Sequence, residues 1–293
     1  MVWAALFALT PLAHGVILYW DGNNTTAGAG TTPTATWSTT GGANKKWTTN
    51  IAGTATTVNY TSGSDAVFSA ASDATGSYTV TVSGTQNVSS ILVEDGNPTF
   101  TSGTVNFNDA SPALTINTGH TLNFNSALTS SNTGGLNLSG GGTVSLGSTT
   151  TLSGTLNLGV SGVSGTTLRL NAITLNLGTL NVTANSTIDF AGAASTLAVT
   201  NLTIAPGVTL TVTNWQNAVD FFSATNWAGV TPNTIGGSIT NQVSFTGFTA
   251  NTTGWTSAGE VRPMPEPSTY GLLLLGATGS FLGWRRWRQS QRA

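Results

Sequence analysis

The chain has 293 residues, of which only 6% are charged, with 36 glycines and no cysteine. The absence of cysteine excludes a disulfide framework and all thiolate metal sites. From Val16 to Pro267 the sequence has four basic and ten acidic residues, a formal charge of −6. This segment therefore has no basic patch that could bind nucleic acid.

The N-terminal segment, 1–15, predicts a signal peptide. Residues 1–12 are apolar apart from Thr10 and Pro11, and Ala13-His14-Gly15 offers the small residues that a signal peptidase recognises. We therefore expect cleavage after Gly15. No Lys or Arg precedes the apolar stretch, which leaves open an earlier start codon or a first strand that is not cleaved.

Residues 16–77 differ from the following segment in their large aromatic side chains, among them Trp20, Trp37 and Trp47. We interpret this segment as an N-terminal β cap that covers the first coil of the structure expected for the following residues.

Residues 78–213 contain the repeating pattern that decides the fold class. Apolar residues alternate with Thr, Asn or Ser in "YTVTVSG", "TLNFN", "GLNLSG", "TLNLG" and "TLTVT", and Gly-rich turns separate these stretches. Strict alternation over four to seven residues indicates half-buried strands, and this much apolar surface argues against disorder. No amphipathic helix is expected here.

Many very short strands favour a coiled β-solenoid, in which small Leu, Val and Ile ladders fill a narrow interior. At roughly 20–25 residues a coil, residues 78–213 would form about six coils. We expect an all-β, right-handed parallel β-helix or β-solenoid. A β-sandwich is the alternative, although its core usually has larger side chains and longer strands.

Residues 214–262 are again rich in aromatic residues, which include Trp215, Trp227, Trp255, Phe221, Phe222, Phe245 and Phe248. The open ends of a solenoid must be covered, so both aromatic segments are interpreted as β caps. Alternatively, Trp37, Trp47, Trp227 or Trp255 could stack on sugar rings and bind carbohydrate.

The last segment, residues 263–293, has the form of a sorting tag. Pro265-Glu266-Pro267 precedes an uncharged stretch, residues 270–284, and then Arg285, Arg286 and Arg288. As a helix the stretch would reach about 22 Å at ~1.5 Å per residue, less than the ~30 Å of a hydrocarbon core. We expect a short transmembrane helix with a basic stop on its cytoplasmic side; a helix docked on the protein's own core is the alternative.

The string "MPEPSTYGLLLLGATGSFLGWRRWR" resembles the PEP-CTERM sorting signal of Gram-negative bacteria. The resemblance covers this string alone, with Met264 where many members have Val. It implies recognition by an exosortase, a membrane cysteine protease-transpeptidase, with processing near Pro265-Glu266-Pro267. It also implies a bacterium that makes exopolysaccharide and forms biofilms.

The body resembles the autotransporter-associated β-strand repeat proteins. The resemblance rests on "GGLNLSGGGTVSLGSTTTLSGTLNLG" at residues 134–159 and on the opening "YWDGNN" with its following tryptophans. It implies a passenger-like β-helix and no particular activity.

Catalytic residue types are scarce between the two ends. His120, Arg169, Asp109 and Asp189 are the candidates for a polysaccharide lyase or hydrolase, whose chemistry needs paired carboxylates, a His base or an Arg beside a metal. Their spacing gives no reason to expect them in one cleft. We expect no catalytic, cofactor-binding or metal-binding residues, and Glu94-Asp95 with Gly96 is expected to form a turn.

These observations predict an exported structural or adhesive protein of the cell surface or extracellular matrix. It would reside transiently in the inner membrane before processing by an exosortase-type enzyme. Exopolysaccharide is the expected binding partner if there is one.

Overall fold

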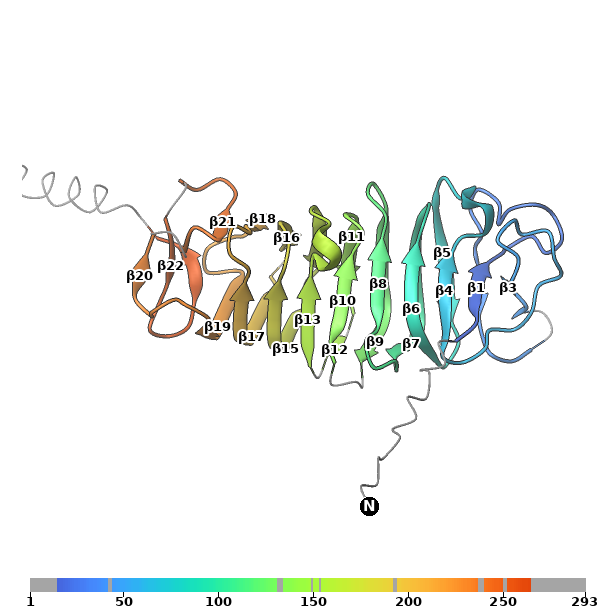
Figure 1. The fold of residues 1–293 in the computed structure, drawn as a ribbon, viewed down its shortest axis with the longest axis horizontal. Helices are drawn as coiled ribbons and strands as arrows, with labels where there is room; N and C mark the ends of the chain where they lie inside the picture. Colours follow the sequence, from blue (N-terminus) through green and yellow to red (C-terminus); the bar gives the residue numbers. More distant parts are fainter. Residues whose placement is uncertain are drawn as a thin grey trace, which may run out of the picture.

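The computed structural model describes residues 15–264, apart from 42–43, 131–133, 149, 153, 192–193, 237–239 and 250–251. Within these residues the chain is a right-handed parallel β-solenoid of about seven turns. Its long axis runs horizontally in Figure 1, with the blue N-terminal cap at one end and the orange C-terminal cap at the other. The predicted all-β solenoid is confirmed, and the β-sandwich alternative is wrong.

Each coil crosses three faces, which we number in the order that the chain visits them, and strands of successive coils pair in parallel on each face. Face 1 contains β2 (Ala35–Trp37), β5 (Ser77–Val82), the first half of β7 (Asn97–Phe107), the first half of β9 (Thr121–Ser130), β11 (Thr143–Leu146), β14 (Thr166–Leu170), β16 (Ser186–Asp189), β18 (Leu210–Thr213) and β21 (Val243–Phe245).

Faces 2 and 3 share several strands that bend from one face to the next. Face 2 contains the first half of β6 (Thr85–Val93), the second halves of β7 and β9, β12 (Thr150–Leu152), and the first parts of β15 (Thr174–Val182), β17 (Thr196–Ile204) and β19 (Phe221–Trp227). Face 3 contains β1 (Ile17–Trp20), β4 (Ser64–Phe68), β8 (Ala113–Ile116), β10 (Leu136–Ser139), β13 (Thr155–Leu158) and the last parts of β6, β15, β17 and β19.

The alternation of the sequence places every second side chain of a strand in the narrow interior. On face 3, Leu114, Leu138, Leu158, Val182 and Ile204 stack in register, one from each successive coil, and all are buried. Burial of each such side chain stabilises the fold by about 1.5–3 kcal/mol relative to exposure. The solenoid therefore has one continuous aliphatic core, in which the inward side chains of each coil pack against those of the preceding coil.

The parallel pairing extends beyond residues 78–213 in both directions. On the N-terminal side β4 pairs with β6, and on the C-terminal side β18 pairs with β21. Two short 3₁₀ turns, η2 (Ala70–Ser72) and η3 (Val160–Gly162), lie at corners of the coils.

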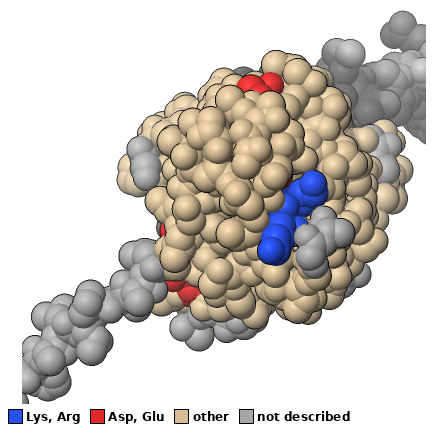
Figure 2. Space-filling view, turned by 90° about the vertical axis from the view of Figure 1, so that its right-hand side faces the viewer, with Lys and Arg blue, Asp and Glu red and all other residues tan. Residues whose placement is uncertain are grey.

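A packed aromatic cluster closes the N-terminal end. Trp20, Trp37 and Trp47 are fully buried; Trp47 contacts the other two and all three contact Phe68, with ring centroids 5.1 to 5.8 Å apart. The short strand β3 (Trp47–Thr48) pairs antiparallel with β1 and covers its edge. Figure 2 views this end of the molecule, where acidic and basic atoms occupy little of the visible surface. The cap thus pairs the outer edge of β1, one of the edges that an open end would expose.

A different arrangement closes the C-terminal end. The strands β20 (Thr234–Ile235), β22 (Thr253–Trp255) and β23 (Val261–Pro263) form a small antiparallel sheet. Trp255 lies edge-on to Trp227, and its indole N–H donates a hydrogen bond of 3.0 Å to the carbonyl oxygen of Ala224 in the last coil.

Residues 1–14 of the predicted signal peptide lie outside the described residues, and so do the sorting-tag features Pro265, Glu266, Pro267, residues 270–284, Arg285, Arg286 and Arg288. Within the part of the chain that the structure describes, no helix has the length and apolar character needed to cross a membrane.

Candidate binding site on face 1

A column of outward-facing polar residues runs along face 1. Asn123, Ser145, Arg169 and Asp189 occupy the same position in four successive coils. Neighbouring strands of a sheet lie about 4.8 Å apart, so side chains of successive coils in this column come within hydrogen-bonding reach. The parallel register thereby brings Arg169 and Asp189 together, although they belong to different coils of the chain.

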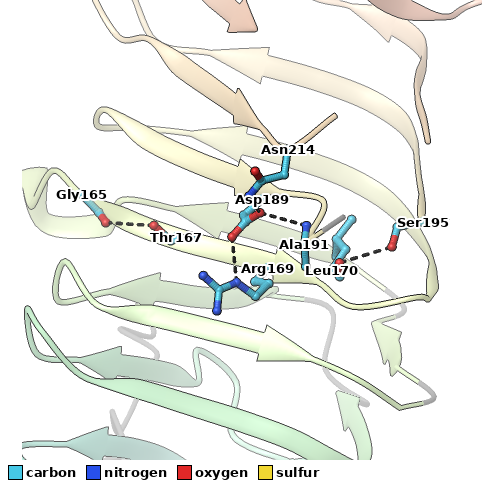
Figure 3. Close-up of polar contacts among 8 residues, drawn as sticks. All are labelled: Gly165, Thr167, Arg169, Leu170, Asp189, Ala191, Ser195 and Asn214. Carbon is cyan, nitrogen blue, oxygen red and sulfur yellow. Dashed lines mark hydrogen bonds and ion pairs between the residues drawn. The ribbon is translucent and has the colours of Figure 1, made fainter. Parts of the chain in front are cut away.

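Arg169 and Asp189 form an ion pair at the centre of this column. The Nε of Arg169 donates a hydrogen bond of 2.7 Å to Oδ2 of Asp189. The other carboxylate oxygen accepts hydrogen bonds from Asn214 Nδ2 at 2.7 Å and from the Ala191 amide at 2.9 Å. Figure 3 shows the carboxylate held between these three donors. Asp189 is therefore fixed in position by three neighbouring segments of chain.

Two opposing effects set the pKa of Asp189. Burial of the carboxyl raises its pKa, but the hydrogen bonds from Asn214, Ala191 and Arg169, together with the charge of Arg169, outweigh burial and lower it overall. Asp189 is consequently ionised at neutral pH, and it pairs with the guanidinium of Arg169 through Nε.

The guanidinium of Arg169 has a free edge. The side chain is 42% exposed, and its two terminal nitrogens point away from Asp189 in Figure 3. Among the described residues, the structure gives hydrogen-bond partners only to Nε. The terminal nitrogens can therefore donate to a ligand without breaking the ion pair.

A shallow depression of about 470 Å³ surrounds the ion pair. It is lined by Asn123, Ser145, Arg169, Asn171, Asp189, Ala191 and Asn214. The hollow arises because the coil of β11 has small residues where its neighbours have long ones. Ser145 lies between Asn123 and Arg169, and Gly147 comes directly after the end of the same strand.

Two other depressions lack charged side chains. One lies between the last coil and the loop around Pro232, and the other lies around Pro206 and Gln242. Among the described residues, no three His, Asp or Glu side chains gather closely enough to hold a metal ion. The depression on face 1 is thus distinguished by its ionised groups.

The other two residues considered for catalysis lie elsewhere. His120 precedes β9 and has Nδ1 3.0 Å from the carbonyl oxygen of Gly96. Asp109 lies at the corner between β7 and β8, where it accepts hydrogen bonds from Ser89 and Ser111. Only Arg169 and Asp189 of the four candidates meet, so three of them do not share one cleft. Arg169 and Asp189 lie on different coils, as expected, and the register of face 1 brings these two together.

The tryptophans considered for sugar stacking are interior residues. Trp37, Trp47, Trp227 and Trp255 are 0%, 0%, 2% and 4% exposed. Their ring faces contact other core side chains, so they are not available to stack on a sugar ring in this structure.

The buried Asp95 and the half-buried Asp73 bind backbone amides at corners. Asp95 accepts hydrogen bonds from the amides of Ser69 and Ala74, and Asp73 accepts them from Ala29 and Gly30. These carboxylates join neighbouring coils and are not directed into an open site.

Asn214 and the amides of Asn123 and Asn171 are the site residues that sequence reasoning missed. An alignment of the strands with one another would have revealed the column. It places "TVS", "TLR" and "TID" at residues 143–145, 167–169 and 187–189 in register, with Ser145, Arg169 and Asp189 in equivalent positions. Asn214, just after β18, lies one position beyond Thr213, which pairs with Asp189.

Comparisons of the chain with protein-family models, with curated proteins and with solved structures find no match. The strand pairings alone define the class of protein, a parallel β-solenoid, and it has a polar depression on one face.

Proposed function

We propose that this chain is an exported structural or adhesive protein of the bacterial cell surface or extracellular matrix, delivered by its C-terminal sorting tag. The observation that carries the proposal is the combination of a capped β-solenoid body with a C-terminal segment that resembles a PEP-CTERM signal. A rigid rod with neutral, polar faces suits a role in a matrix, and the tag suits export to it.

The outer surface of the solenoid supports this proposal. Its strands present Thr, Asn and Ser outward, as in the face 1 column of Thr121, Thr143, Thr167, Thr187 and Thr211. Such short neutral side chains form hydrogen bonds with water and with hydroxylated polymers and carry no net charge. A surface of this kind is compatible with a hydrated matrix.

The position of the tag is also consistent with processing. Met264 is the last described residue, and its amide donates a hydrogen bond of 2.7 Å to the carbonyl oxygen of Thr252 in the C-terminal cap. Pro265-Glu266-Pro267 follows directly. A cut near this motif would release the whole capped solenoid and leave its folded residues intact.

The proposal is tested by the fate of the chain in a bacterium that has an exosortase. An epitope inserted beside Gly119, at an open turn where an added Cβ would meet nothing within 4 Å, reports the location of the body. The variant with Pro265→Ala and Pro267→Ala should accumulate in the inner membrane, whereas the parent should reach the surface or matrix. The matched control is Pro232→Ala, a change outside the tag.

Mass spectrometry of the extracellular protein supplies the second readout. We expect a C-terminus near Pro265-Glu266-Pro267. An extracellular chain that still ends in Arg292-Ala293, or an unchanged distribution of the double variant, would contradict the proposal.

A further inference from the structure

We infer that the depression around Arg169 is a subsite for the carboxylate of an acidic sugar residue, a uronate, within an extracellular polysaccharide. The polysaccharide as partner rests on the proposed function, whereas the carboxylate subsite rests on the geometry of face 1.

The first argument is the free edge of the Arg169 guanidinium. Arginine presents five N–H donors in a planar fork that matches a carboxylate with two parallel hydrogen bonds. Asp189 occupies the Nε position and leaves the two terminal nitrogens open. Because three donors hold Asp189, the fork is oriented before a ligand arrives, which lowers the entropy that binding costs.

The second argument is the chemistry of the surrounding side chains. Asn123, Asn171 and Ser145 line the hollow, and their amide and hydroxyl groups can both donate and accept hydrogen bonds. Ala191 is the single apolar residue among those that line it. A ligand with one carboxylate and several hydroxyls satisfies this lining, whereas an apolar ligand does not.

The third argument is the distribution of charge. Between Lys46 and Arg262, Arg169 is the only basic residue of the sequence. Figure 2 shows basic side chains in one patch on the end view, and Lys45 and Lys46 are the basic residues of that cap. An acidic polymer therefore finds a single cation on the described coils, so recognition occurs at one sugar residue and not along a basic surface.

The test measures binding of oligogalacturonate to the full chain in mild detergent, by calorimetry. Its fully methyl-esterified form, which has the same hydroxyls and no carboxylate, is the matched probe. We expect binding of the acid and at least about tenfold weaker binding of the ester, since charge-assisted hydrogen bonds are lost.

Variants place the effect at the site. Arg169→Gln should weaken binding of the acid by about tenfold or more, and Arg169→Lys should recover only part of it because a single ammonium cannot pair bidentately. The control is Arg262→Gln, since Arg262 is also an exposed arginine in an ion pair, with Glu260 at 3.1 Å, and it should bind like the parent. Thermal unfolding of each variant confirms that the solenoid is intact.

Equal binding of acid and ester, an unchanged affinity in Arg169→Gln, or no binding of the acid would overturn the inference. A chain that binds oligogalacturonate but never leaves the inner membrane would overturn the proposed function alone. A chain that reaches the matrix without binding the acid would overturn only the uronate subsite.

Discussion

The side-chain amide of Asn157 donates a hydrogen bond of 2.8 Å to the side-chain oxygen of Asn137, which occupies the same position one coil earlier. Asn181 continues the row by donating to Asn157 at 3.2 Å. Every amide in this row donates toward the N-terminus. On face 3 the coils are therefore joined by side chains as well as by the backbone.

Replacement of the central member should measure this coupling. Asn157→Ala removes one donor and one acceptor, and we expect a loss of about 1 kcal/mol in the free energy of unfolding. Chemical denaturation measures the change. The control is Asn176→Ala, because Asn176 is exposed and has no side-chain hydrogen bond among the described residues; equal losses in both variants would refute the ladder's contribution.

The ion pair on face 1 should make stability depend on pH. The pKa of Asp189 is lowered from its ordinary value of 3.8, so its contribution is present above about pH 4 and is lost as the pH falls through the lowered folded value. Asp189→Asn should therefore be less stable than the parent at pH 7 by about 1–2 kcal/mol.

This difference should shrink as the pH falls below about 4, because the unfolded chain and then the folded parent take up the proton there. Urea unfolding from about pH 6 down to about pH 2 follows both proteins. A difference that stays constant with pH would show that the ionised form of Asp189 adds nothing to stability.

The N-terminal aromatic cluster should be essential to folding. Trp47 is fully buried and contacts Trp20, Trp37 and Phe68, so Trp47→Ala should cost about 3–5 kcal/mol. Phe221, which is 47% exposed on face 2, is the aromatic control, and Phe221→Ala should cost less than ~1 kcal/mol. Similar losses of thermal stability in the two variants would argue against a packed cap.

Two turn glycines with similar backbone angles should respond differently to alanine. Gly119 has φ +88° with open space around it, whereas a Cβ on Gly140, at φ +99°, would overlap the backbone carbonyl of Ile116 in the preceding coil. We expect Gly119→Ala to cost about 1–2 kcal/mol through backbone strain alone.

Gly140→Ala should cost a further 1–3 kcal/mol or so, because the two coils must move apart. The comparison of the two denaturation midpoints isolates the contact between coils from the strain of the turn. Equal costs would mean that the coils do not approach each other as closely as the structure has them.

The solenoid could be predicted because its cause is local. Alternation such as that of "TLNLG" at residues 155–159 requires one buried and one solvated side of a strand, and the short glycine-rich turns favour coiling over a sandwich. The predicted length of a coil, roughly 20–25 residues, agrees with the inward ladder from Leu114 to Ile204.

The site could not be predicted in the same way because it depends on register. The step along the chain from Leu138 to its partner Leu158 is shorter than the next step, from Leu158 to Val182. Coils of unequal length hide which residues stack until each strand is aligned with its neighbour. The pairing of Arg169 with Asp189 is a contact between coils, so spacing alone did not reveal it.

The interpretation of the tryptophans met a similar limit. The sequence indicates that aromatic residues gather at both ends, but a cap and a sugar-binding platform can share that composition. Only the packing of Trp37 and Trp47 around Phe68 shows that their ring faces are turned inward.

The two caps differ from each other and from the coils between them, and each coil contacts mainly its neighbours. Duplication of one coil in the gene would therefore lengthen the rod by about 4.8 Å and leave both ends unchanged. The length of the rod can therefore change in uniform steps of one coil without a new fold.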